Sequence, residues 1–164
     1  MKTITRFKIY LPVTAMILAV ALAVPAAAQK PVPFEGALRG QDADIGGPDT
    51  AFLVETSGTG IGTPVGQFSF TQKFALNFDT GAETGSAHWI AANGDSIFTT
   101  IVGQGEPTDT PGVNRIVEID TITGGTGRFA GAVGGFTVER LITLATGFTS
   151  GSFHGTITSP GAAH

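Results

Sequence analysis

Residues 65–78 alternate strictly between large apolar and polar side chains, and this pattern constrains the fold more than any other feature of the chain. The segment reads VGQFSFTQKFALNF, and its large apolar positions are Phe68, Phe70, Phe74, Leu76 and Phe78. Successive side chains of a β-strand point to opposite faces, so this alternation predicts a strand with one face on a core. The fold must therefore present a sheet face to an apolar interior.

Residues 114–158 carry three apolar-rich runs separated by glycine and threonine, without helical periodicity. The turn pattern T-G-x-x-[TS]-G occurs at residues 80–85 and 146–151, and a version one residue shorter occurs at 123–127. Glycine supplies positive φ in such turns, so each predicts a tight reversal between antiparallel neighbours. We expect an all-β domain of seven or eight strands in a meander, either closed as a barrel or folded as a sandwich.

Turn residues predict where the strands begin and end. We expect strands over residues 34–40, 51–56, 65–78, 85–92, 96–103, 113–122, 136–144 and 152–158, with a short extended segment at 128–133. Residues 41–50 and 104–112 are expected to be loops, residues 57–64 are too glycine-rich for a regular strand interior, and residues 134–135 form a bend. The pair Asn93-Gly94 predicts a two-residue type I′ hairpin turn.

The first 28 residues have the pattern of a cleaved export signal. Lys2, Arg6 and Lys8 precede an apolar run over residues 11–24, and Ala26 and Ala28 form a small-x-small cleavage site. The alternative is a membrane anchor, but the run is shorter than the roughly 20 residues that span a bilayer. We expect a signal peptide at 1–28, an extended lead-in at 29–33, the β domain at 34–158 and a disordered tail at 159–164, in a secreted or periplasmic protein.

The charge of the chain without this leader excludes several classes of partner. Six Lys and Arg would remain against thirteen Asp and Glu, a net charge of −7. Nucleic acids require a basic face, and anionic membrane surfaces attract one, so neither is an expected partner. The chain has no cysteine, which excludes disulfides, thiolate metal sites and a cysteine nucleophile.

Residues 124–134, GGTGRFAGAVG, resemble the GGTG-[KR]-F-x-x-A-x-G segment of the dirigent and allene oxide cyclase-like β-barrels. The strand at 137–144 and the closing GSFHGTI at 151–157 are similar to those of small secreted bacterial members. This resemblance implies an eight-stranded antiparallel barrel with an apolar lumen, often assembled as a homotrimer. Plant members cyclise an unstable epoxide or orient phenoxy radicals there without a metal or organic cofactor, so no cofactor is expected here.

Polar residues that interrupt apolar strand faces are the candidate site residues. Gln72 lies among phenylalanines, Arg140 among Phe136, Val138, Ile142 and Leu144, and Arg115 with Val113, Val117 and Ile119. A buried guanidinium or amide needs a partner, and Glu55 is a candidate counter-charge. Candidate catalytic residues are therefore Arg115, Arg140 and Glu55, and candidate ligand-binding residues are Gln72, Phe70, Phe74, Trp89 and Arg140. Alternatively, Arg140 and Arg115 lie at a rim and pair with Glu139 or Glu118 on neighbouring strands.

Other chemistry-bearing residues give weaker signals. His88 could act as a general base, but it points outward if its neighbour Trp89 is in the core. The three histidines lack metal-ligand spacing, and the acidic segment 42–49 lacks the register and terminal glutamate of a calcium loop, so no metal is expected. No G-x-S-x-G elbow and no phosphate loop with its lysine occur.

Three functions remain open on the sequence. The barrel could be a cofactor-free cyclase or isomerase that shapes a small apolar substrate, or a non-catalytic ligand carrier. It could also be a structural or surface protein with a solid barrel core. A lumen of several hundred cubic ångströms that contains Arg115 or Arg140 would favour the first two.

Overall fold

The computed structural model describes residues 30–47 and 51–158. The expected signal peptide at 1–28 and the expected tail at 159–164 lie outside these residues. In the described part of the chain, no helix is long and apolar enough to cross a membrane.

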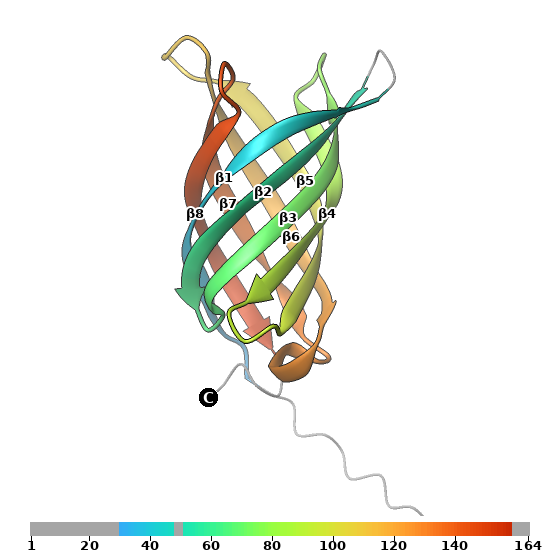
Figure 1. Ribbon diagram of the computed structural model, residues 1–164, viewed down its shortest axis with the longest axis vertical. Coiled ribbons are helices and arrows are strands. Elements are labelled where there is room, and N and C mark those ends of the chain that lie inside the picture. The colour runs from blue at the N-terminus through green and yellow to red at the C-terminus, as the bar shows by residue number, and fades with distance from the viewer. Residues whose placement is uncertain (1–29, 48–50, 159–164) are drawn as a thin grey trace, which may run out of the picture.

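Eight antiparallel strands form a closed barrel in which each strand pairs with the next and the last pairs with the first (Figure 1). The strands are β1 (Val32–Gly46), β2 (Ala51–Thr63), β3 (Gly66–Asn77), β4 (Ala82–Ala91), β5 (Ser96–Pro107), β6 (Val113–Gly125), β7 (Val133–Thr143) and β8 (Phe148–Thr158). A 3-10 helix, η1 (Gly127–Phe129), lies between β6 and β7. The predicted eight-stranded antiparallel meander barrel is confirmed.

Several strands are longer than predicted, and in β2 the reason is that inward-facing glycines fit beneath aromatic rings. The predicted loop at 41–50 belongs largely to β1, the glycine-rich segment 57–63 to β2, and residues 104–107 to β5. A Cβ atom at Gly58 would lie 2.7 Å from the Phe70 ring, and one at Gly60 would lie 2.3 Å from the Phe68 ring. Glycine in β2 therefore makes room for the large side chains of β3, which is why the strand continues.

The connections also differ from the predicted turns. The hairpin between β4 and β5 forms at Asn93-Gly94, but only Gly94 has positive φ, so the turn is not type I′. It closes through hydrogen bonds from Gly94 N to Ala91 O and from Ala91 N to Asp95 O, both 2.8 Å. Residues 127–129, within the turn and extended segment predicted there, form η1, which brings Phe129 into the core. Gly134 and Gly135 lie within β7 rather than at a bend.

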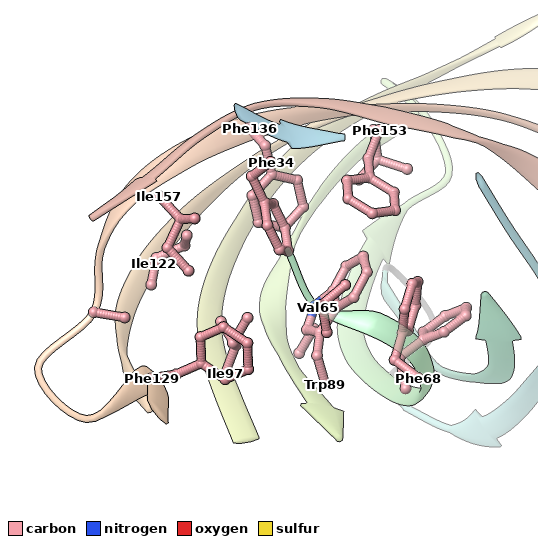
Figure 2. Packing of buried hydrophobic residues seen from close by; sticks show 14 of the residues in the cluster. Phe34, Val65, Phe68, Trp89, Ile97, Ile122, Phe129, Phe136, Phe153 and Ile157 are labelled. Atoms are coloured by element: carbon pink, nitrogen blue, oxygen red, sulfur yellow. The ribbon is translucent and has the colours of Figure 1, made fainter. Parts of the chain in front are cut away.

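One half of the barrel interior is solid. We call the end reached by the β2–β3 and β4–β5 connections and by η1 the closed end. Trp89 is fully buried there and packs against Phe34, Phe68, Phe70, Phe136 and Phe153, with ring centroids 4.8 to 6.1 Å apart. Phe129 and Ile97 fill the space toward the end itself (Figure 2). These contacts make the closed half the hydrophobic core.

Candidate functional site

The opposite end of the barrel holds a cavity of about 420 Å³. This open end is the one reached by the connections after β3, β5 and β7. The apolar lining consists of Phe52, Val54, Phe74, Leu76, Phe78, Ile116, Ile142 and Leu144, and the charged lining consists of Asp42, Asp44, Glu83 and Arg140. The volume falls in the range of small-molecule sites, which are mainly apolar with a few polar groups.

Between the cavity and the aromatic core lies a buried polar layer. Its members come from every strand: Asp42, Thr56, Gln72, Glu83, Thr99, Glu118, Asp120, Arg140 and Thr149. The strand alternation that points Phe68 and Phe70 inward also points Gln72 inward, two residues further on. The polar layer therefore forms the floor of the cavity and the roof of the core.

One glycine on β5, Gly103, makes room for two glutamates side by side. Glu83, Gly103 and Glu118 are directly paired across β4, β5 and β6. A Cβ atom at Gly103 would lie 2.4 Å from Glu83 Oε1 and 3.0 Å from Glu118 Cγ. Without a side chain at this position, both carboxyl groups occupy the interior over the same strand.

Arg140 is the buried cation of the layer, and its guanidinium group is extensively paired. Nη2 and Nε donate to Glu118 Oε1 at 2.9 and 3.2 Å, and Nη1 donates to Asp42 Oδ2 at 3.1 Å and to Thr149 Oγ1 at 3.2 Å. Asp42 also accepts from Thr56, and Glu118 accepts from Gln72. Burial lowers and the two neighbouring carboxylates more strongly raise the pKa of Arg140, so it stays charged.

Two further carboxyl groups are buried without enough positive charge to balance them. Burial, followed by the negative charge of Glu118, raises the pKa of Glu83 to about 8. Burial also raises the pKa of Asp120 to about 8, although Asp120 accepts a 2.6 Å hydrogen bond from Thr99. Within the described part of the chain, Glu83 Oε1 and Asp120 Oδ1 have no hydrogen-bond partner. Both groups are therefore neutral acids near pH 7, and Glu83 faces the cavity.

The structure brings some of the sequence-predicted site residues together and separates others. Arg140 and Phe74 line the cavity, with the guanidinium carbon 5.7 Å from the ring centroid. Gln72 lies in the polar layer beneath them and bonds Glu118 at 3.4 Å. Phe70 and Trp89 belong to the solid closed half, where their stacked rings contact other aromatic residues rather than the cavity.

The other two candidates for catalysis lie on the outer surface. Arg115 forms a 2.8 Å ion pair with Glu139, and Glu55 forms a 2.9 Å ion pair with Lys73; all four side chains are at least one-third exposed. The cross-strand pairs of the alternative are therefore present, Arg115 with Glu139 and Arg140 with Glu118, but Arg140 is buried in the polar layer rather than placed at a rim. Glu55 is not the counter-charge of an interior arginine.

His88 lies on the outer side of β4, as expected from the burial of Trp89. Its ring stacks on Phe98 with centroids 4.8 Å apart, and its Nε2 is 2.9 Å from Ser96 Oγ. His154 is on the exposed side of β8, and His164 lies outside the described residues. The described part of the chain contains no cluster of His, Asp and Glu side chains arranged to hold a metal ion.

The sequence patterns did not reveal three acidic members of the polar layer, Asp42, Glu83 and Asp120, and they indicated Glu118 only as a partner of an arginine at the rim. Asp42 was placed in a loop and Glu83 in a turn because each is surrounded by glycine and polar residues. Glu118 and Asp120 alternate with Val117 and Ile119, so the outer face of β6 resembled a core face. Ile116 and Ile122 lie on the same face of β6 as Glu118 and Asp120 and are both buried. This pair of flanking isoleucines is the sequence signal that indicates the inner face.

Comparison of the chain with known protein families, curated proteins and solved structures gives no match. The resemblance to dirigent and allene oxide cyclase-like barrels therefore stays a prediction.

Proposed function

We propose that this protein binds a small, largely apolar molecule in the open-end cavity. The observation that carries the proposal is the division of one barrel into two halves. The closed half is packed with aromatic rings, whereas the open half contains about 420 Å³ of space with apolar walls over a charged floor. A solid structural barrel has no physical need for this arrangement, because burying several charges away from water costs free energy.

The setting of this binding function is part of the same proposal. The N-terminal sequence pattern supports export to the periplasm or the medium. The eight-stranded barrel with polar groups inside an apolar lumen supports the relationship to dirigent and allene oxide cyclase-like proteins, and with it assembly as a homotrimer. Function does not follow from the fold alone.

Catalysis without a cofactor is the second candidate, and Glu83 is the observation that favours it. A carboxylic acid whose pKa is raised to about 8 is protonated at neutral pH and can donate a proton to a substrate oxygen. Isomerisation or cyclisation of an apolar substrate would need such a donor in a water-poor cavity. In this arrangement Arg140 is ion-paired to Glu118 and Asp42, so two carboxylates remain next to Glu83.

Native mass spectrometry of the full chain purified from its own host tests the binding proposal. We expect a retained small molecule, and we expect the neutral fluorophore N-phenyl-1-naphthylamine to compete with it. The variant Gly105→Leu adds a side chain beside Ile116 at the cavity wall and should abolish both signals. The matched control Thr100→Leu places the same side chain on the exposed outer face of β5 and should keep them.

The outcomes separate the candidate functions. Equal ligand retention in both leucine variants, or no binding of ligand or fluorophore by the wild-type protein, would contradict the proposal and favour a structural role. A ligand recovered unchanged after incubation identifies a carrier. Turnover that disappears in Glu83→Gln identifies an enzyme. The same spectra report whether the protein is a trimer.

A further inference from the structure

The polar floor of the cavity carries more negative than positive charge. Arg140 is the cation of the buried polar layer, and it is ion-paired to both Glu118 and Asp42. Two carboxylates on one guanidinium leave one negative charge uncompensated, before Glu83 and Asp120 are considered. An excess charge in a site away from water is stabilised by a cation of opposite sign.

We propose that the ligand is a monocationic amine, with one primary or secondary ammonium group on an apolar body, and that Glu83 receives the ammonium at the cavity floor. This inference rests on the proposed binding function and names its ligand class. Three features of the described residues support it independently: the charge balance, an unpaired carboxyl oxygen and the saturation of Arg140.

Glu83 supplies the unpaired hydrogen-bond acceptor. Its side chain is 2 % exposed and lines the cavity, and its Oε1 atom has no partner in the described part of the chain. A buried oxygen without a donor costs about 1–3 kcal/mol, so a ligand that donates a hydrogen bond there recovers that free energy. An ammonium group provides both the donor and the positive charge, which a quaternary amine or an alcohol does not.

Anionic ligands are disfavoured because the guanidinium group of Arg140 is already occupied. Four hydrogen bonds at 2.9 to 3.2 Å bind it to Glu118, Asp42 and Thr149. A ligand carboxylate would have to displace one of these acceptors and then lie near the carboxylates of Asp42 and Asp44, which also line the cavity. Like charges at such short range repel strongly in a water-poor site.

The walls above the floor fit an apolar body rather than a second charge. Phe52, Val54, Leu76, Ile142 and Leu144 line the cavity between the polar layer and the open end. Phe78 also lines the cavity, with its ring centroid 3.9 Å from that of Phe52. A ligand with its ammonium at Glu83 would extend its apolar part along these side chains toward the open end. Asp44 lies on the same lining and adds to the negative potential that attracts a cation.

Binding of an ammonium should release a proton from Glu83. The free protein holds Glu83 as a neutral acid near pH 7, and the ammonium keeps its own proton because amines of this kind titrate near 10.4. The carboxyl proton therefore passes to the buffer as the ion pair forms. The charged groups that act on Glu83 are Glu118 on β6, Arg140 on β7 and Asp42 on β1, and Asp44 on β1 lines the same cavity. Asp120 on β6 and Gln72 on β3 belong to the same polar layer.

Calorimetric titration of the full chain with octylamine, octan-1-ol and octanoate tests the ligand class. The three probes share one apolar chain and differ only in the head group. We expect octylamine to bind at least tenfold more tightly than octan-1-ol, and octanoate to bind most weakly. Titration at pH 7 in buffers of different ionisation enthalpy should show release of about one proton with octylamine and none with octan-1-ol.

The variant Glu83→Gln keeps the shape of the side chain and removes its charge. We expect it to weaken octylamine binding at least tenfold, to leave octan-1-ol within about twofold, and to abolish proton release. Glu55→Gln, on the exposed outer face, is the matched control and should change neither. In the wild-type protein, the affinity for octylamine should rise by roughly tenfold per pH unit as pH increases toward 8, because Glu83 must ionise.

Different results would contradict the ligand class and the binding function. If octan-1-ol or octanoate binds as tightly as octylamine, the cavity binds apolar molecules but the ligand is not an amine. If octylamine binds without proton release and with an affinity that does not depend on pH, Glu83 is not its partner. These two measurements need only the wild-type protein, so they decide the matter even if Glu83→Gln does not fold. If neither the three probes nor N-phenyl-1-naphthylamine bind, the proposed function itself is wrong.

Discussion

Arg140 shows how a single residue joins the two halves of the barrel. Arg140 comes after Phe136 and Val138 on the inner face of β7, and its guanidinium group pairs with Glu118 and Asp42. Removing only the cation would leave two carboxylates in the polar layer without a compensating positive charge. That situation costs far more than the net free energy of the intact ion pairs, because the desolvation of the remaining charges is no longer offset.

We therefore expect Arg140→Met to lower the free energy of unfolding by about 3–5 kcal/mol. Urea unfolding followed by the fluorescence of Trp89, the single tryptophan, measures this directly. Arg115→Met removes an arginine from an exposed ion pair and should cost no more than about 1 kcal/mol. Equal losses in the two variants would mean that water enters the polar layer and screens it.

Glu83 gives the stability of the barrel a characteristic pH dependence. Its carboxyl group has an ordinary pKa of 4.5 in an unfolded chain and about 8 in the folded protein. Between these values the folded state retains a proton that the unfolded state has lost, so stability falls as pH rises. Asp120 acts in the same direction between its ordinary 3.8 and about 8.

We expect each group to lower the free energy of unfolding by about 1.4 kcal/mol per pH unit within its window. Glu83→Gln does not titrate, so the stability of this variant relative to wild type should rise from pH 5 to pH 8 and then level off. Urea unfolding at several pH values gives this difference, and Glu139→Gln, on the exposed outer face, serves as the control. A difference that does not depend on pH would show that Glu83 is ionised in the folded protein.

Strand β2 illustrates how glycine can be required in the middle of a strand. Gly58, Gly60 and Gly62 face inward, and rings from β3 and β8 lie directly on their backbone. A methyl group at Gly60 would lie 2.3 Å from Phe68 Cζ and 2.4 Å from Ala37 O, and the backbone oxygen cannot move aside. The large rings and the glycines are therefore one packing unit contributed by two strands.

Gly60→Ala should accordingly destabilise the protein by about 3 kcal/mol or more, since overpacking a closed core forces backbone shifts. Thr59→Ala changes the neighbouring residue on the outer face of the same strand and should have an effect below about 1 kcal/mol. Urea unfolding distinguishes the two. A neutral Gly60→Ala would indicate that β2 separates easily from β1, contrary to the close backbone approach.

The sequence predicted inner faces well where one side of a strand is consistently apolar. In β3 and β7 the alternation is one-sided, so the inward positions of Gln72 and Arg140 followed from their neighbours. In β6 both sides carry β-branched residues, and the face that holds Arg115 was chosen as the interior when it is the outer one. Alternation locates a strand reliably, but it identifies the buried face only when the opposite face is polar.

The polar layer could not be predicted for a related reason. Its acids come from segments far apart in the sequence, and no local pattern records that Glu83 and Glu118 meet over Gly103. Their contact depends on the strand register around the closed barrel, which a single sequence does not specify. The extent of β2 was likewise missed, because inward glycines look like loop residues until their aromatic partners are known.

The barrel as a whole should be unequally stable along its axis. The closed half contains the packed rings around Trp89, together with η1, whereas the open half contains a cavity and incompletely balanced charges. Backbone hydrogen bonds open more readily where fewer apolar contacts must be broken. Local opening should therefore start at the open end and require global unfolding at the closed end.

Hydrogen exchange followed by mass spectrometry tests this gradient. Peptides around Trp89, Phe136 and Phe153 should exchange slowest, with protection close to the global free energy of unfolding. Peptides from the open-end parts of the same strands, such as residues 82–85 of β4 and 141–143 of β7, should exchange faster. Gly105→Leu fills part of the cavity and should slow exchange at the open end only, while Thr100→Leu should leave the pattern unchanged. Uniform protection along the strands would contradict the division of the barrel into a solid half and a half that is shaped to admit a ligand.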